Sequence, residues 1–265
     1  MKLPLYQVDA FTDKVFGGNP AAVCPLKEWL SNEKLQKIAL ENNLSETAFF
    51  VPQKVGYHLR WFTPAAEVDL CGHATLASAH ILYEHLGYEE DKVTFQSRSG
   101  ILTVTRSDQG LTMDLPSWEY EEVAPEDKKK IEQVLGLPTF SVLKGKSVWV
   151  AVLDSAEKVK SIKPDIIKIL SLKDVIGLVV TAPGTEGVDF VSRFFAPQVG
   201  IDEDPVTGAT HCLLAPYWGK IQDKTELSAR QLSARGGSLL CNLAKEKRVE
   251  ITGTAVTYLE GSINV

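Results

Sequence analysis

The fold is decided by the stretch RWFTP (residues 60–64), which leads to CGHAT (71–75) and then to an apolar helix. About half the chain later the pattern returns as RFFAP (193–197), DPVTGA (204–209) and a second apolar helix. Each copy combines an aromatic strand, a proline turn, an acidic loop and a glycine that opens a helix. This repetition predicts two similarly folded halves that face each other across a cleft. The two helix starts would direct unpaired N–H groups and positive dipole ends at one shared anion.

Many short strands with one buried helix per half predict an α+β fold. We expect two pseudo-symmetric halves, each a curved, mostly antiparallel sheet around a central helix, at 72–85 in the first and from 208 in the second. Pro216 is expected to limit the second of these helices, because proline lacks the N–H that a helix interior needs. Another helix is expected at 156–170.

The polar stretch 119–130 has the composition of a linker between domains. It predicts an N-terminal half at 1–118 and a C-terminal half at 128–254, with the active site in the cleft between them. Within the first half, Ser31 is expected to cap a short amphipathic helix.

Composition bounds the kind of protein. The chain has 265 residues, 44% of them apolar and 23% charged, which is ordinary for a globular protein. Its net charge of −6 argues against binding to nucleic acid or to an anionic membrane. We find no secretory signal and no run near the ~18 apolar residues of a membrane span. The four cysteines fit neither a disulfide framework nor CxxC metal spacing, so a reduced, cytoplasmic protein is expected.

Three titratable residues lie beside the predicted helix starts and strands. Glu46 enters an apolar strand, where burial would stabilise a protonated carboxyl and suit a base that must return its proton. His73 directly follows the helix-opening Gly72, and Asp204 precedes Pro205 in the acidic loop. Each also has a purely structural interpretation: a strand-edge carboxylate in solvent, a structural histidine, and a helix cap or solvated loop residue.

Several kinds of site are disfavoured by spacing. The histidines form no HExxH or other tight ligand pattern, and no phosphate loop, dinucleotide fingerprint or GxSxG elbow is present. The sequence therefore predicts neither a metal nor an organic cofactor. A racemase that uses two thiols would need Cys71 and Cys212, but Cys212 lies a turn inside its helix instead of at its start.

Seven blocks of sequence, in order along nearly the whole chain, resemble the PhzF (phenazine biosynthesis-like) isomerase family. They are VDAFT (8–12), GNPAAV (18–23), LSETAF (44–49), FTP (62–64), EVDLCGHAT (67–75), EDPVTG (203–208) and QLSARGG (231–237). The resemblance implies a diaminopimelate-epimerase-like fold, a homodimer, and a reaction that uses neither metal nor organic cofactor. By family analogy the last strand, from 255 to 265, returns to the first half.

The resemblance also implies roles for single residues. Glu46, His73 and Asp204 correspond to the family's catalytic residues, which shift a proton on a small, carboxylate-bearing, amino-acid-like substrate in a biosynthetic process. As substrate-binding residues we predict Asn19, Gly72, Ala74, Gly208, Ala209 and Thr210.

One position departs from the family pattern. Ala209 stands where the family usually has Ser, so a substrate-binding hydroxyl is absent or displaced to Thr210. Adjacent helical side chains point about 100° apart, so the Thr210 hydroxyl cannot easily take the place of the missing serine hydroxyl. We therefore favour an altered substrate. The same departure supports the alternative of a non-catalytic binding or regulatory protein that retains the cleft.

Overall fold

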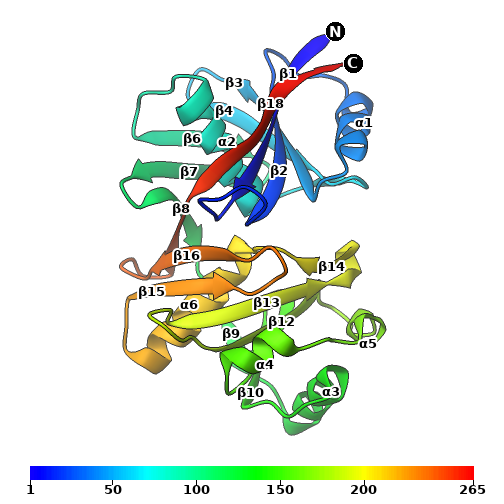
Figure 1. The fold of residues 1–265 in the computed structure, drawn as a ribbon, viewed down its shortest axis with the longest axis vertical. Helices are drawn as coiled ribbons and strands as arrows, with labels where there is room; N and C mark the ends of the chain where they lie inside the picture. Colours follow the sequence, from blue (N-terminus) through cyan, green and yellow to red (C-terminus); the bar gives the residue numbers. More distant parts are fainter. The chain divides into compact units, whose positions relative to one another are not determined.

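A computed structural model describes the whole chain, residues 1–265 (Figure 1). The chain divides into two compact units, one of residues 1–115 with 250–265 and the other of residues 116–249. Strands outnumber helices in both units, and the predicted α+β class is confirmed.

The first unit is built on a mixed sheet. β1 pairs antiparallel with β2 and with β18, β2 runs parallel to β3, and β3 runs antiparallel to β4. β4 lies antiparallel to β5 and parallel to β6, which continues into the β6–β7–β8 meander. The elements are β1 (Lys2–Ala10), β2 (Asn19–Pro25), α1 (Asn32–Asn42), β3 (Glu46–Pro52), β4 (Tyr57–Phe62), β5 (Glu67–Val68), α2 (Gly72–His85), β6 (Lys92–Ser97), β7 (Gly100–Ser107), β8 (Gly110–Pro116), β17 (Arg248–Gly253) and β18 (Ala255–Asn264).

The second unit repeats this pairing pattern. β10 pairs antiparallel with β9 and β11, β11 runs parallel to β12, and β12 runs antiparallel to β13. β13 then lies antiparallel to β14 and parallel to β15, which pairs antiparallel with β16. The elements are β9 (Tyr120–Glu122), α3 (Pro125–Leu135), β10 (Ser141–Gly145), β11 (Val148–Val152), α4 (Ala156–Ser161), α5 (Ile166–Leu170), β12 (Gly177–Pro183), β13 (Phe190–Ala196), η1 (Pro197–Val199), β14 (Ile201–Asp204), α6 (Gly208–Gln222), β15 (Glu226–Gln231) and β16 (Gly237–Asn242).

The repeat seen in the sequence is thus a repeat of topology. Strands β1 to β7 and β10 to β16 have the same sequence of parallel and antiparallel pairings, with α2 and α6 at equivalent positions. An arginine on the fourth strand of each repeat makes a two-pronged contact with a glutamate on the next strand. Arg60 binds Glu67 at 2.7 and 2.8 Å, and Arg193 binds Glu203 at 2.7 and 2.9 Å. These paired contacts hold each acidic loop at a fixed distance before its helix.

Helix α2 is the central element of the first unit. Nearly all its side chains from His73 to Tyr83 are buried, and it packs against β1, β2 and β3. It ends where Gly87 takes a φ of 65°, and the N–H of Tyr88 bonds to the carbonyl of Leu82 at 3.0 Å. A helix buried on all sides stays in place by packing, so its first turn is held rigidly.

Helix α6 contradicts the expectation that Pro216 limits it, because the helix continues through this residue to Gln222. Proline leaves the carbonyl of Cys212 without its usual helical donor. The N–H of Trp118 donates to that carbonyl at 2.9 Å instead. A partner distant in sequence therefore removes part of the cost of an internal proline.

Two other expectations about local structure are wrong. Residues 119–130, expected to be a linker, contain β9 and the first half of α3. The single helix expected at 156–170 is two helices, α4 and α5, because Pro164 disfavours helical geometry in the residue before it. The Arg193 guanidinium caps the end of α4 by donating to the carbonyl of Ile162 at 2.7 Å.

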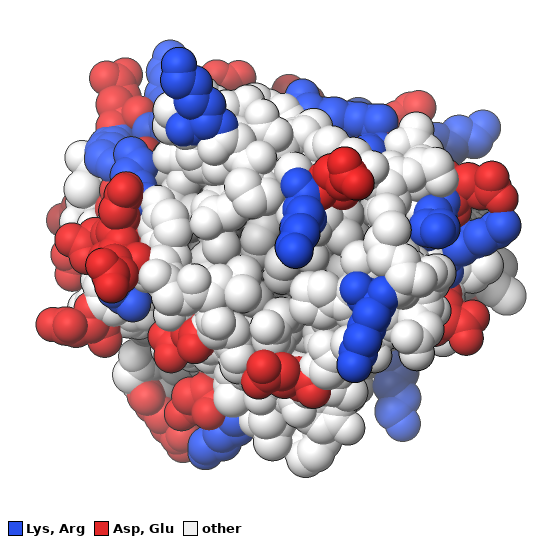
Figure 2. Space-filling view, turned by 90° about the horizontal axis from the view of Figure 1, so that it is seen from above, with Lys and Arg blue, Asp and Glu red and all other residues white.

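The molecular surface carries mixed charge on the face shown in Figure 2. Lys and Arg side chains alternate there with Asp and Glu around a broad uncharged area. This face therefore lacks the continuous basic field that binding to a phosphate backbone needs. None of the helices combines the length and apolar character required to cross a membrane.

Candidate active site

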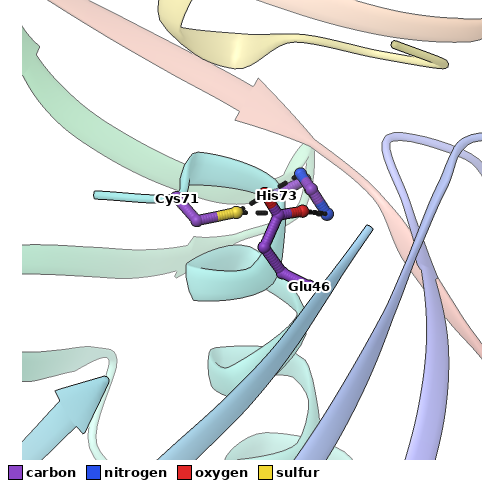
Figure 3. A group of neighbouring side chains, drawn as sticks. All are labelled: Glu46, Cys71 and His73. Carbon is purple, nitrogen blue, oxygen red and sulfur yellow. Dashed lines mark hydrogen bonds and ion pairs between the residues drawn. The ribbon is translucent and has the colours of Figure 1, made fainter. Parts of the chain in front are cut away.

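Glu46 and His73 form a buried ion pair in the first unit (Figure 3). Glu46 opens β3, and His73 is the second residue of α2. Oε2 of Glu46 lies 3.2 Å from Nε2 of His73, and the two side chains are only 13% and 7% exposed. Low exposure strengthens the attraction between opposite charges, because little water screens it.

Cys71 completes a cluster of three with this pair. Its Sγ lies 3.5 Å from Nδ1 and 4.0 Å from Nε2 of His73. Burial, followed by the nearby Glu46 carboxylate, raises the pKa of the Cys71 thiol. We therefore assign a neutral thiol to Cys71 in the resting protein.

The charge state of His73 follows from its partners. Burial opposes the charged imidazolium, but Cys71 and Glu46 outweigh it and raise the pKa of His73 well above its usual value. The raised pKa favours the imidazolium form of His73, whose Nε2 faces the Glu46 carboxyl group at 3.2 Å.

The starts of α2 and α6 differ from those of most other helices in the chain. Ser31, Ser155 and Asp165 cap α1, α4 and α5 with side-chain oxygens. Neither Cys71 before α2 nor Thr207 before α6 makes a capping hydrogen bond of this kind. In α2 the Ala74 N–H approaches the Cys71 sulfur, which is a weak acceptor. Both first turns thus keep N–H groups with the geometry and charge to bind an anion.

Asp204 is buried in the second unit within a hydrogen-bond network. The Thr207 hydroxyl donates to its carboxylate, and the Gln231 side-chain amide donates to its backbone carbonyl at 2.7 Å. Oε1 of Gln231 accepts from the Thr207 N–H at 3.0 Å. Gln231 is itself fully buried, so it fixes the loop that leads into α6.

Gln231 begins the family block QLSARGG (231–237), and the sequence alone indicates no role for it. A buried glutamine looks like any other polar residue in a strand until its partners are known. Its two backbone partners lie far away in the sequence, so no local pattern could reveal them.

The predicted substrate-binding residues lie at three places. Asn19 is buried at the start of β2, whereas Gly72 and Ala74 belong to the first turn of α2. Gly208, Ala209 and Thr210 form the first turn of α6. The structure therefore brings Glu46, His73, Gly72 and Ala74 together in the first unit, and Asp204 with the α6 start in the second.

Thr210 uses its hydroxyl within the protein. It is 2% exposed and donates to the carbonyl of Thr207 at 2.9 Å. Nδ1 of His211 contacts the same carbonyl at 2.8 Å, and burial lowers the pKa of His211 to about 4, so this histidine is neutral. Ala209, in contrast, remains partly exposed.

A model of the family described as phenazine biosynthesis-like protein matches residues 8–261. The chain belongs to this family. An uncharacterized isomerase of Pseudomonas aeruginosa is 48% identical over 265 residues, with all of both chains covered. A crystal structure of a PhzF family protein from Enterococcus faecalis superposes with a TM-score of 0.94 at 45% identity, covering 100% of each chain.

The phenazine biosynthesis-like family shares its fold with more distant proteins. A hydroxyproline epimerase from Agrobacterium vitis superposes with a TM-score of 0.62 at 11% identity, covering 99% of this chain and 91% of its own. At this identity the likeness concerns the fold alone. The predicted epimerase-like fold is therefore confirmed.

Proposed function

We propose that the protein is an isomerase that moves a proton on a small, carboxylate-bearing, amino-acid-like substrate by acid–base catalysis without a cofactor. The observation that carries this proposal is the buried Glu46–His73 pair, which lies at the uncapped start of α2. Isomerase names among close family relatives agree with this reaction class.

Glu46 acts as the base in the proposed reaction. Its carboxylate takes a proton from one substrate carbon and becomes a carboxylic acid, while the substrate becomes a delocalised anion. The same carboxyl group then returns the proton to another carbon. A well-placed acid–base group of this kind contributes about 10²–10⁴-fold in rate.

His73 balances charge during the transfer. In the resting site its imidazolium faces the Glu46 carboxylate. Once Glu46 is protonated, this positive charge has lost its partner and can stabilise the anionic intermediate. The low exposure of both side chains makes that stabilisation larger than it would be in water.

The first turn of α2 would bind the substrate carboxylate. Its N–H groups lack a capping oxygen, and the positive end of the helix dipole favours a negative ligand. The role of Asp204, to orient a polar or cationic group of the substrate, remains a prediction. The homodimer also remains a prediction.

Proton exchange in heavy water tests the proposal. Metabolites selected by thermal shift are incubated with the protein, and deuterium uptake at carbon is measured by mass spectrometry. We expect uptake with at least one amino or enamine acid. Tight binding of many such ligands without any exchange would contradict it and support the non-catalytic alternative that the Ala209 departure suggests.

A further inference from the structure

The last strand, β18, lies at an exposed edge of the sheet in the first unit (Figure 1). It pairs with β1, which pairs with β2 on its other side. Five consecutive residues, 258–262, are exposed, among them Tyr258 at 48% and Leu259 at 41%. The strand contains no proline, lysine or arginine, the residues that most often protect a sheet edge from other chains. A long edge of this kind is suited to pairing with a further strand.

The backbone groups that face away from β1 follow from the pairing of the two strands. The N–H of Val265 donates to the carbonyl of Met1 at 2.8 Å, and the Met1 amino group donates to the carbonyl of Val265. Bonded pairs alternate with unbonded pairs in an antiparallel ladder, so Ile263 and Gly261 also direct their N–H and C=O groups to β1. The alternate residues direct theirs to the free edge. They are Glu260, Ser262 and Asn264.

A groove lies beside the same edge, where the end of β18 passes α1. Its volume is about 500 Å³, and Ile38, Ile263 and Val265 provide its apolar lining. Leu259 and Ile263 are four residues apart on one strand, so they project from the same face of the sheet. One face of β18 therefore carries an exposed leucine near the middle of the strand and an apolar groove near its end.

We propose that β18 pairs antiparallel with β18 of a second copy of the chain, about a twofold axis at Gly261. This register places Leu259 of each copy opposite Ile263 of the other, so each leucine enters the groove of the other copy. Glu260 and Ser262 of one copy exchange backbone hydrogen bonds with Ser262 and Glu260 of the other. A twofold contact requires a self-complementary surface, and β18 carries both the leucine and the groove that receives it.

The remaining side chains of the strand are compatible with this contact. Glu260 projects from the opposite face, where its carboxylate lies 3.4 Å from Nδ1 of His85, so no charge enters the groove. Gly261 lacks a side chain at the axis, where the two Cα atoms of an unbonded pair approach to about 4.5 Å. The exposed rings of Phe16 and Tyr258, 5.6 Å apart, extend the apolar surface beside Leu259.

This surface is independent of the proposed function, because it contains none of the candidate active-site residues. The family resemblance implies a homodimer but assigns no surface to it. The edge of β18 supplies one, with backbone hydrogen bonds that fix the register and an apolar contact that supplies affinity.

Sedimentation equilibrium of the intact chain tests the interface. We expect a dimer at micromolar concentration. Leu259→Glu should raise the dissociation constant of the dimer at least about 30-fold, because each dimer would then place two carboxylates in apolar grooves. Leu240→Glu is the matched control, since Leu240 is also a strand leucine that is 41% exposed, on β16 of the second unit. It should leave the dissociation constant unchanged.

A cross-link tests the register. The four native cysteines are buried, so Gly261→Cys adds one exposed thiol, and its Cβ would contact only the Leu259 side chain at 3.8 Å. Cα atoms about 4.5 Å apart across the axis lie within the range of a disulfide. Mild oxidation should therefore link Gly261→Cys into a covalent dimer at least about 10-fold faster than Thr105→Cys, an exposed position on β7.

Each outcome decides the proposal without any measurement of turnover. A monomeric wild type would overturn it, and so would a dimer that persists in Leu259→Glu or one that dissociates equally in Leu240→Glu. Cross-linking of Gly261→Cys at the rate of Thr105→Cys would overturn the register. If Leu259→Glu fails to fold, the wild-type mass and the cross-linking rates decide. A protein that dimerises in this way but exchanges no proton would refute the proposed function alone.

Discussion

Gln231→Leu should destabilise the second unit through two backbone groups. The fully buried amide donates to the carbonyl of Asp204 at 2.7 Å and accepts from the N–H of Thr207 at 3.0 Å. Leucine has nearly the same size but can make neither bond. Each buried backbone group left without a partner costs about 1–3 kcal/mol, and the added apolar burial offsets part of this.

The expected net loss is about 3 kcal/mol, equivalent to a fall in Tm of roughly 6–12 °C for a chain of this size. Differential scanning calorimetry measures it, with Gln133→Leu as the control because Gln133 is exposed on α3 of the same unit. A Tm for Gln231→Leu within about 2 °C of both the wild type and the control would refute the role given to this amide.

Three further changes follow from the same structure. The pKa of His73 is raised in the folded protein, so protonated His73 stabilises the fold fully below about pH 6.5. This stabilisation is lost as the pH rises through the pKa that His73 has in the folded protein. The Tm gap between the wild type and His73→Gln should therefore narrow as the pH rises above about 6.5, and a gap that widens would contradict the ion pair. Gly177→Ala should lower the free energy of unfolding by about 3 kcal/mol or more, because the new Cβ would lie 2.2 Å from the carbonyl oxygen of Phe195. Thermal melting measures this loss, and a Tm near that of the wild type would be inconsistent with the contact. Thr210→Ala should lower the free energy of unfolding by about 1 kcal/mol but leave substrate affinity nearly unchanged, because the Thr210 hydroxyl donates to the carbonyl of Thr207. A large loss of substrate affinity, measured by calorimetry, would count against this assignment.

Local patterns predicted those elements whose signals lie within a few residues. The central helix 72–85 has the predicted bounds, and Ser31 caps α1 as expected. Their signals are an apolar run and a capping hydroxyl, both of which act over a few residues.

One error lies where a distant contact overrides local preference, and in another a distant contact adds to a local signal. Pro216 stays inside α6 because Trp118, far away in the sequence, provides the missing donor. Pro164 indicates the break between α4 and α5. The Arg193 guanidinium that caps the end of α4, however, belongs to a strand distant in the sequence. Local signals set the elements, whereas long-range hydrogen bonds decide where some of them end.

The candidate site shows the same division. The glycine-led helix starts were visible as a repeat, and the family resemblance pointed to Glu46 and His73 individually. Their separation of 3.2 Å, and the approach of Cys71 to both, depend on the register of β3 with β2 beneath α2. No spacing along the chain encodes that register.

The central claim, that Glu46 moves the proton, is tested most directly by comparing deuterium uptake in Glu46→Gln and in the wild type. Glutamine keeps the size of the side chain but cannot accept the proton, so we predict a rate at least about 10²-fold lower with substrate binding nearly intact. Glu41→Gln, an exposed carboxylate at the end of α1, should exchange at the wild-type rate. Exchange by Glu46→Gln at the wild-type rate would contradict the account.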